Sequence, residues 1–339
     1  LILHMNNWKG KNDVLLIAEI GGNHEGNFEY AKKLTQLAIE SNVDFIKYQI
    51  YTGDTLVSKL ESPKRNSHFK KFELTKQQYI ELAKMCHKNN VKFMASVWNL
   101  DSISWIDEYM EIYKIGSGDL TAYPVIEQTC KIGKPLILST GLSTLKEVQN
   151  TVDFIRKVNP KYHNKNMLAL LQCTSMYPIP FSDANLNTLE SLKEINGCEV
   201  GYSDHTEGSY ALEIAVAKGA KILEFHFTDS REDKSFRDHK VSLTKSEVIE
   251  LIQKIKNIKS LEGDSVKKPL AVEGDHIKTF RRALYPKIDL PEGTVLKESD
   301  LIALRPNSGI DARDYQKIIG KKLLKGVKKH EKLDYKILK

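Results

Sequence analysis

Cysteine is scarce in this sequence, and long hydrophobic runs are absent. The 339 residues include only four cysteines, namely Cys86, Cys130, Cys173 and Cys198. No two of them have the C-x-x-C spacing typical of zinc sites, and they do not suggest a disulfide framework, so we expect free thiols in a reducing compartment. No run approaches the roughly 20 apolar residues that a membrane helix needs, and no signal-peptide pattern is present. These absences predict a cytoplasmic protein with no membrane partner.

The positive charge is modest and lies mainly near the C-terminus. The formal net charge is +7, and residues 283–339 contain 13 Lys and Arg against 8 Asp and Glu. Segments that bind single-stranded nucleic acid interleave aromatic residues with their cations, but only Tyr315 and Tyr335 lie near these lysines. We therefore predict a solvated basic face that raises the local anion concentration, and no nucleic-acid partner.

Eight short apolar runs alternate with amphipathic segments along most of the chain. The runs are rich in Ile, Leu and Val, and they span residues 15–20, 44–50, 91–97, 112–117, 135–140, 168–173, 198–204 and 221–227. Helical spacing of apolar residues follows in between, at 28–41, 75–89, 144–158, 207–218 and 246–260. Continuous apolar runs are typical of strands buried on both faces of a parallel sheet. Eight such units predict a (β/α)8 barrel, whereas the rival open sheet lacks a G-x-G-x-x-G motif after a strand.

The pattern changes after the eighth unit. We assign residues 5–260 to the barrel, 261–282 to a polar linker and 283–339 to a small, mainly β domain with turn signals such as Pro291–Gly293. A domain of about 55 residues buries little of its own surface, so we expect it to dock elsewhere. Leu1–His4, which precede Met5, are interpreted as vector sequence.

Polar side chains end every predicted strand. The C-terminal ends of the strands form the active-site face of such a barrel. The polar residues there are Glu19, Lys47, Gln49, Ser96, Lys114, Ser117, Asp119, Ser139, Thr140, Thr174, Ser175, Tyr177, Ser203, Asp204, His205, Glu224 and His226. A purely structural barrel does not need such residues at all eight ends, so the sequence predicts an active site.

Two histidines are candidate metal ligands. His205 and His226 belong to neighbouring predicted strands, which run about 5 Å apart, so both rings can reach one ion. Two neutral imidazoles with open positions suit a divalent metal that polarises a substrate carbonyl. The alternative is a pair of hydrogen-bonded structural histidines.

The remaining polar residues suggest an anion site. Lys47 and Lys114, with hydroxyls around them, suit a phosphate and a carboxylate; the alternative is a single Schiff-base lysine. The carboxylates of Glu19, Asp119 and Glu224 could perform acid–base work or simply neutralise the lysines. Tyr177 is a candidate wall for a sugar ring or plain packing.

Six ordered motifs resemble the sialic acid synthase family, which comprises N-acetylneuraminate synthase and its legionaminic and pseudaminic acid relatives. They are Ala18–Gly26 (AEIGGNHEG), Tyr113–Gly118 (YKIGSG), Leu138–Gly141 (LSTG), Cys173-Thr174 with Tyr177-Pro178, Gly201–Thr206 (GYSDHT) and Leu223–Phe227 (LEFHF). The C-terminal domain resembles the antifreeze-like (SAF) domain, with Leu304–Gly309 (LRPNSG) as its marker. The resemblance covers nearly the whole chain.

The resemblance implies a synthase that condenses phosphoenolpyruvate with an open-chain N-acylated amino hexose, such as N-acetylmannosamine, and releases phosphate. It implies Mn²⁺, or else Mg²⁺ or Co²⁺, on His205 and His226. The residues implied to bind phosphoenolpyruvate are Lys47, Ser96, Lys114, Ser117, Ser139 and Ser203. Glu19, Asp119 and Glu224 would act in catalysis. The residues implied to contact the sugar are Gln49, Asp119, Tyr177, Asp238 and Arg305, the last from the partner's lid in a domain-swapped homodimer.

The sequence departs from the family pattern on the sugar side of the expected pocket. Asp119 replaces the usual Glu, Ser175 an Asn, and Phe225 a commonly basic residue, while Asp238 lies in a loosely matching segment. These changes leave the acceptor sugar open.

Three other functions remain open at this point. A synthase acting on a phosphorylated aldose would need a second basic cluster, which could comprise Arg231, Lys234 and Arg237. A Schiff-base aldolase is the second alternative. A non-catalytic carbohydrate- or ice-binding protein is the third, and only the C-terminal domain suggests it.

Overall fold

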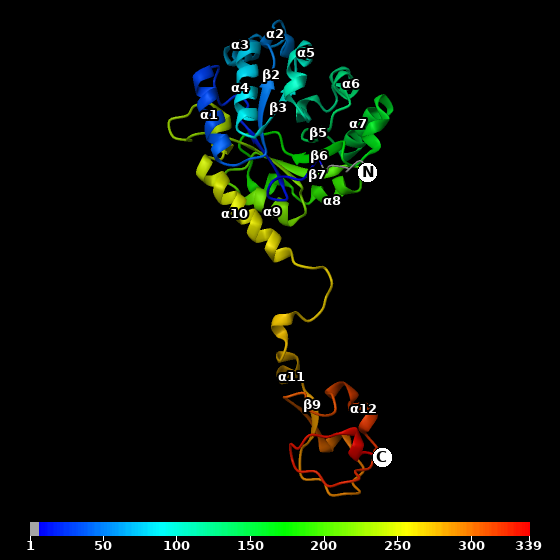
Figure 1. Cartoon of the computed structure of the whole chain (residues 1–339). Helices are drawn as coiled ribbons and strands as arrows, with labels where there is room; N and C mark the ends of the chain where they lie inside the picture. Colours follow the sequence, from blue (N-terminus) through cyan, green and yellow to red (C-terminus); the bar gives the residue numbers. More distant parts are fainter. Residues whose placement is uncertain (1–6) are drawn as a thin grey trace. The chain divides into compact units, whose positions relative to one another are not determined.

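A closed barrel of eight parallel strands forms the first part of the chain, as predicted (Figure 1). The computed structural model describes residues 7–339, so the segment interpreted as vector sequence lies outside the described residues. The strands are β1 (Leu15–Glu19), β2 (Phe45–Ile50), β3 (Lys92–Val97), β4 (Tyr113–Ile115), β5 (Leu136–Ser139), β6 (Leu168–Cys173), β7 (Glu199–Asp204) and β8 (Ile222–His226). Each strand pairs with the next along the chain, and β8 closes onto β1 with His226 beside Glu19.

Helices surround this barrel. The α-helices of this unit are α1 (Phe28–Glu40), α2 (Gly53–Leu56), α3 (Pro63–Phe72), α4 (Lys76–Lys88), α5 (Ile103–Ile106), α6 (Tyr123–Ile132), α7 (Leu145–Val158), α8 (Thr188–Lys193), α9 (Tyr210–Ala217) and α10 (Lys245–Glu262). Four of them begin with a reciprocal capping box, in which a threonine hydroxyl accepts from the third helical residue and that residue's side chain accepts from the threonine N–H. The threonines are Thr52, which pairs with Thr55, and Thr75, Thr144 and Thr244, which pair with Gln or Glu. The sequence pattern T-x-x-[EQ] thus fixes where the latter three helices start.

Two apolar layers hold the barrel together. The larger packs the outward faces of the strands against the helices. The smaller fills the barrel interior with Trp8, Leu15, Ile17, Phe45, Met94, Ile112, Ile137, Ala169, Leu171 and Ile222. Because side chains alternate between the two faces of a strand, these interior positions also specify which later residues point inward.

The connection between β2 and α4 contains a helix that the sequence reading did not anticipate. Helix α3 begins after Ser62, with Pro63 at its first position, where the missing proline N–H costs nothing. Asn66 anchors the segment by donating to the carbonyls of Gly53 and Val57, at 2.9 and 2.8 Å. This insertion places several aromatic residues near the C-terminal ends of the strands.

The C-terminal part forms a second unit, which spans Asp264–Lys339. Strands β9 (Ala283–Pro286) and β10 (Leu301–Leu304) pair antiparallel around a small core that includes Leu296, Ile318 and Leu323. Helix α10 continues to Glu262, and the segment predicted as a linker includes α11 (His276–Phe280); α12 (Tyr315–Ile318) follows β10. Within residues 7–339, no helix is long and apolar enough to cross a membrane.

We expect Gly201, in the middle of β7, to be essential for the contact between β7 and β8. An added Cβ would lie 2.4 Å from the Ile222 carbonyl oxygen and 2.6 Å from Leu171 Cδ2, so the backbone would have to shift. Gly201→Ala should lower the free energy of unfolding by about 1–3 kcal/mol or more, as overpacking does. Denaturant unfolding measures this. Gly118→Ala is the matched control, because an added Cβ there meets nothing within 4 Å; equal losses in both variants would contradict the packing argument.

Candidate active site

The inward-facing side chains change from apolar to polar halfway along the barrel. In β1, Ile17 belongs to the interior core and Glu19 lines a cavity; in β8, Ile222 is followed in the same way by Glu224 and His226. The cavity measures about 1080 Å³. Every residue to which the resemblance assigns a role, except Arg305, lines it, as this list shows: Glu19, Lys47, Gln49, Ser96, Lys114, Ser117, Asp119, Ser139, Tyr177, Ser203, His205, Glu224, His226 and Asp238. Of the other polar strand-end residues, Ser175 lines it, whereas Thr140, Thr174 and Asp204 do not. The barrel therefore brings these side chains together at one end.

Four buried charges form the floor of the cavity. Lys47 Nζ lies 2.7 Å from Glu19 Oε2 and 3.5 Å from Glu224 Oε1. Lys114 Nζ donates to Glu224 Oε1 at 3.1 Å. We call these four residues the charge quartet. Glu224 is its hub, because one of its oxygens faces both lysines and also lies 3.4 Å from Ser203 Oγ.

The quartet is electrostatically asymmetric. Burial raises the pKa of Glu19 and outweighs the opposing effect of Lys47. Burial alone would also raise the pKa of Glu224, but Lys114 and Lys47 together hold it below its ordinary value. Burial lowers the pKa of Lys114 despite Glu224, whereas the two glutamates raise the pKa of Lys47 against the effect of burial. Glu19 is thus the carboxylate that most readily takes up a proton, and Lys47 the amine that most firmly keeps one.

Hydroxyl groups surround the quartet. Ser96 and Ser139 are buried in β3 and β5, and the β3–β4 register places Ser96 beside Lys114. Ser117, after β4, accepts a hydrogen bond from the Gly141 N–H at 3.1 Å. Gln49 donates to Glu19 Oε1 at 2.7 Å and so holds the other oxygen of that carboxylate. Two lysines and several hydroxyls on one floor can bind a phosphate or a carboxylate.

Polar atoms without partners mark the same cavity. Among the residues the structure describes, Ser139 Oγ, Glu224 Oε2 and His226 Nδ1 are buried cavity-lining atoms without a hydrogen bond. Buried polar atoms normally have a partner, and an unpaired one costs about 1–3 kcal/mol. Their concentration here indicates that a ligand completes the set.

The histidine pair fits a divalent metal ion. The rings of His205 and His226 lie with their centroids 5.4 Å apart. His205 Nδ1 lies 2.7 Å from the Thr174 carbonyl oxygen, which fixes that nitrogen as the donor and leaves Nε2 as a free ligand atom. Burial holds the pKa of His226 well below its ordinary value, so this imidazole is neutral and its unpartnered Nδ1 adds to the fit. Within residues 7–339 no group of three or more His, Cys, Asp or Glu side chains is arranged for a metal, so an ion on this pair would need further ligands from water and substrate.

Beside the histidines stands a wall of aromatic and charged groups. The centroid of the Tyr177 ring lies 4.0 Å from the ring centroid of His205 and 5.5 Å from that of His226. Arg237 covers the face of Tyr177 at 4.7 Å, and its Nε lies 3.2 Å from Asp238 Oδ1. The other oxygen of Asp238 lies 3.9 Å from His226 Nδ1. Asp238 and Tyr177 are therefore placed next to the histidine pair, as a sugar-contacting role requires.

Sequence reasoning missed several residues of the outer cavity. They are Tyr51, Phe69, Phe72, Trp98 and Phe236. Trp98 follows Ser96 by two positions, so the alternation along β3 would have pointed it inward. Phe72 and Phe236 pack together, with their ring centroids 4.9 Å apart, although Phe72 ends α3 and Phe236 lies in the loop after β8. That contact depends on the insertion after β2, so the polar residues at the strand ends could not predict it.

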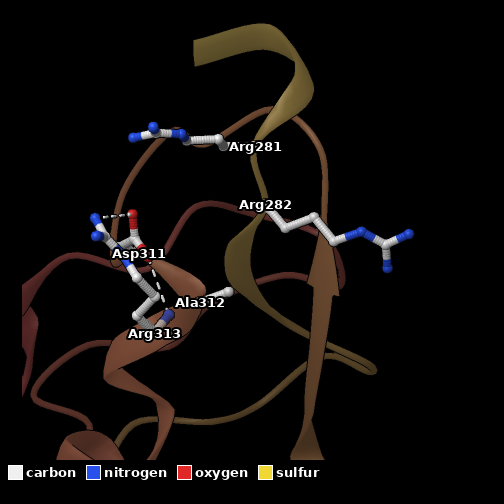
Figure 2. A pocket seen from close by; sticks show the side chains of 5 residues that line it. All are labelled: Arg281, Arg282, Asp311, Ala312 and Arg313. Carbon is white, nitrogen blue, oxygen red and sulfur yellow. Dashed lines mark hydrogen bonds and ion pairs between the residues drawn. The ribbon is translucent and has the colours of Figure 1, made fainter. Parts of the chain in front are cut away.

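Arg305, the remaining predicted residue, belongs to the C-terminal unit. It follows β10 and its guanidinium lies 5.4 Å from the centre of the Phe280 ring. The same unit contains a hollow of about 380 Å³ lined by Arg281, Arg282, Asp311, Ala312 and Arg313 (Figure 2). Asp311 accepts from both Nε and Nη2 of Arg313, at 2.9 and 3.0 Å, and Arg282 donates to the Ala303 carbonyl. This hollow has no nucleophile or acid–base pair, so the candidate active site is the barrel cavity.

The sequence matches two known families. Residues 34–267 match the NeuB family and residues 281–336 match the SAF domain. The N,N'-diacetyllegionaminic acid synthase of Campylobacter jejuni is 34% identical over 94% of this chain and 98% of its own. The N-acetylneuraminate-9-phosphate synthase of Homo sapiens is 29% identical over 93% of this chain and 90% of its own. The crystal structure of N-acetylneuraminic acid synthetase from Leptospira borgpetersenii, in complex with citrate, superposes with a TM-score of 0.71 at 29% identity and covers 78% of this chain and 90% of that chain.

Replacing Glu224 tests the charge quartet. Glu224→Gln keeps the shape but leaves two buried lysines with one counter-charge, and breaking a buried pair costs about 3–5 kcal/mol. We expect a lower melting temperature, together with a larger stabilisation by inorganic phosphate than the wild type shows, because the added anion replaces the lost charge. Thermal unfolding with and without phosphate measures both effects.

Glu247→Gln is the matched control for that variant. Glu247 also pairs with a cation, since its Oε1 lies 2.6 Å from Arg231 Nη2, but it lies outside the cavity lining. Its response to phosphate should equal that of the wild type. If Glu224→Gln responded no more strongly than this control, the anion site would not lie at the quartet.

Proposed function

The chain belongs to the NeuB family, and from that premise we propose that it is a nonulosonic acid synthase. It would condense phosphoenolpyruvate with an open-chain N-acylated amino hexose, such as N-acetylmannosamine, and release inorganic phosphate. The observation that supports this most directly is the charge quartet with its hydroxyl groups beside a histidine pair. The floor suits an acid with a phosphate and a carboxylate, and the histidines suit the oxygen of an aldehyde.

Phosphoenolpyruvate would bind to the floor. Lys47 and Lys114 would supply the charge, and the hydroxyl donors would be Ser96, Ser117, Ser139 and Ser203. Ser139 Oγ has no partner within the described residues, so it is available to donate. With the anion bound here, the two lysines of the quartet would donate to the ligand and would give up part of their pairing with Glu19 and Glu224.

The acceptor aldehyde would lie beside His205 and His226. A divalent ion on this pair, which we propose to be Mn²⁺, with Mg²⁺ or Co²⁺ as alternatives, would act as a Lewis acid toward the aldehyde carbonyl. Tyr177 and Asp238 flank the pair and would orient the carbon chain of the sugar. Gln49, held by Glu19, would reach the sugar from the other side of the floor.

The atoms balance without any further reagent. Carbon 3 of phosphoenolpyruvate forms a bond to the aldehyde carbon, and the aldehyde oxygen takes up a proton to become a hydroxyl. Water adds to carbon 2, after which the bond between carbon 2 and the phosphate oxygen breaks; the carbon 2 hydroxyl becomes the ketone, its proton passes to the leaving phosphate, and inorganic phosphate leaves. Glu19 has the raised pKa and the position that suit a group that orders this water and accepts its proton. Asp119 and Glu224 would act electrostatically around the reacting atoms.

The geometry argues against the alternative chemistries. A Schiff-base lysine must be neutral, but the glutamates raise the pKa of Lys47. Burial lowers the pKa of Lys114, and for this residue the argument against a Schiff base is its ion pair with the buried Glu224 at 3.1 Å. A phosphorylated acceptor would need Arg231, Lys234 and Arg237 together. Arg231 is bound to Glu247 and Lys234 to Tyr30, both outside the cavity lining, so this basic cluster is not assembled. Burying four charges costs free energy, and a binding protein without catalysis would gain nothing from them that offsets this cost.

The C-terminal unit would serve as a lid. We expect Arg305 to reach the acceptor from the partner subunit of a domain-swapped homodimer, an expectation that comes from the family resemblance. Closure of such a lid would exclude bulk water from the cavity.

Phosphate release is the measurement that tests the proposed function. The assay mixes the protein with phosphoenolpyruvate, Mn²⁺ and one acceptor from a panel: N-acetylmannosamine, its 6-phosphate and the 2,4-diacetamido hexoses. We expect release only when metal and one unphosphorylated acceptor are both present. His226→Ala should lower kcat at least about 100-fold, as loss of a metal ligand or its support does.

Two outcomes would contradict the proposal. Full activity of His226→Ala with the correct acceptor would remove the role of the histidine pair. Trapping of the protein by borohydride with its substrate would establish a Schiff base in its place.

A further inference from the structure

The turn that carries Asp238 follows the last strand of the barrel. It comprises Arg237–Val241, and Asp238 lines the cavity with its Oδ2 3.9 Å from His226 Nδ1. Within residues 7–339, the only hydrogen bond of the Asp238 side chain comes from Arg237 Nε, at 3.2 Å, and 67% of that arginine side chain is exposed. An exposed partner holds a carboxylate only weakly, so the backbone position of Asp238 is what directs its side chain at the histidine pair.

A buried hydroxyl group holds that backbone. Ser242 Oγ donates to the Asp238 carbonyl at 2.7 Å and accepts from Asn23 Nδ2 at 2.8 Å. The direction of both bonds is fixed, because a carbonyl oxygen can only accept and the hydroxyl has a single hydrogen to give. The side chains of Ser242 and Asn23 are both completely buried, so water does not compete for these bonds.

Asn23 connects this turn to strand β8. Its Nδ2 also donates to the carbonyl of Phe227, the residue after His226, at 2.9 Å. The backbone of Asn23 belongs to the turn after β1, where its N–H donates to the Ile20 carbonyl at 2.9 Å. Its Oδ1 has no hydrogen bond within the described residues, so the contribution of the side chain lies in the two bonds that it donates. One amide group thus ties the strand that carries His226 to the turn that carries Asp238.

We propose that Asn23 and Ser242 are positioning residues for Asp238. The relay from Asn23 Nδ2 through Ser242 Oγ to the Asp238 carbonyl fixes the distance between that carboxylate and the His226 ring, and so the place of the acceptor beside the histidine pair. This inference rests on the proposed function and deepens it, since it assigns a role in acceptor binding to two buried residues that do not line the cavity. Both act through Asp238 and do not touch the acceptor themselves.

Ser242→Ala tests the relay. The variant removes the donor to Asp238 and one acceptor of Asn23, while His239 Nδ1 stays 2.7 Å from Thr228 Oγ1 and keeps the turn closed. We expect the KM for the acceptor to rise about 10-fold, as for removal of a residue that orients a group of the site, with the KM for phosphoenolpyruvate unchanged. Phosphate release at varied concentrations of each substrate measures both constants.

Ser41→Ala is the matched control. Ser41 is also completely buried in the barrel unit, and its Oγ donates to the Ala38 carbonyl at 2.7 Å. It follows the C-terminal end of α1, roughly 20 Å along that helix from the turn after β1. Both variants should lower the melting temperature to a similar extent, whereas only Ser242→Ala should change the KM for the acceptor. Equal acceptor KM values in the two variants would overturn the proposal.

Asp238→Ala separates positioning from a general loosening of the site. In a protein without this carboxylate, Ser242→Ala has nothing left to misplace, so it should leave the acceptor KM of Asp238→Ala unchanged. Asn23→Ala should behave in the same way, with a raised acceptor KM in the wild-type background and no added effect in Asp238→Ala. A rise of equal size with and without the carboxylate would contradict the relay.

Hydrogen exchange separates this inference from the proposed function. It is measured by mass spectrometry on the free protein, without substrates or metal. Ser242→Ala should speed exchange in the turn, where the His239 N–H donates to the Phe236 carbonyl at 3.2 Å, and Ser41→Ala should not. Faster exchange without turnover on any acceptor would refute only the synthase. Turnover with an acceptor KM that Ser242→Ala leaves unchanged would refute only the relay, and absence of turnover with unchanged exchange would refute both.

Discussion

Closure of the parallel sheet is the constraint on which the rest of this structure depends. Once β8 pairs with β1, every second side chain of every strand is confined to one interior, where the side chains stack in a few layers before the barrel ends. The lower layer is apolar and gives the barrel its core. The upper layer cannot reach water freely, so its charges must be satisfied by one another or by a ligand. The charge quartet is the result, since Glu224 faces both Lys47 and Lys114.

This constraint explains how much the sequence could predict. The barrel and its SAF-like C-terminal domain follow from the count of apolar runs and the change of pattern after them, and both are confirmed. The cavity residues follow from the polar strand ends, because parallel strands of a closed barrel end at one rim. The pairing among those residues could not be predicted: nothing in the spacing distinguishes Glu224 as the hub from Glu19. Helix α3 was missed since tertiary contacts, such as Asn66 with Gly53 and Val57, stabilise it more than its own apolar spacing.

The quartet also explains how a neutral floor can receive an anion. Two lysines against two carboxylates leave no net charge, so an added phosphate must displace part of the internal pairing. Glu19 is suited to yield, because burial already favours its protonated form. Protonation of Glu19 frees Lys47 for the ligand while Glu224 keeps Lys114 in position. In the proposed reaction this proton would pass to the aldehyde oxygen, after which the ionised Glu19 could accept the proton of the water that adds to carbon 2, so anion binding and proton transfer would use one group.

The net charge of the chain is unevenly divided between the two units. Residues 264–339 contain 18 of the 51 Lys and Arg and 11 of the 44 Asp and Glu, so residues 1–263 contain 33 of each sign. The barrel unit is therefore formally neutral, and the entire net charge of +7 belongs to the C-terminal unit. Phosphoenolpyruvate, the proposed substrate, is a multiply charged anion, and a cationic unit raises the anion concentration around itself. The barrel unit, in contrast, balances its own charges, and the buried charge quartet keeps them paired, which stability requires.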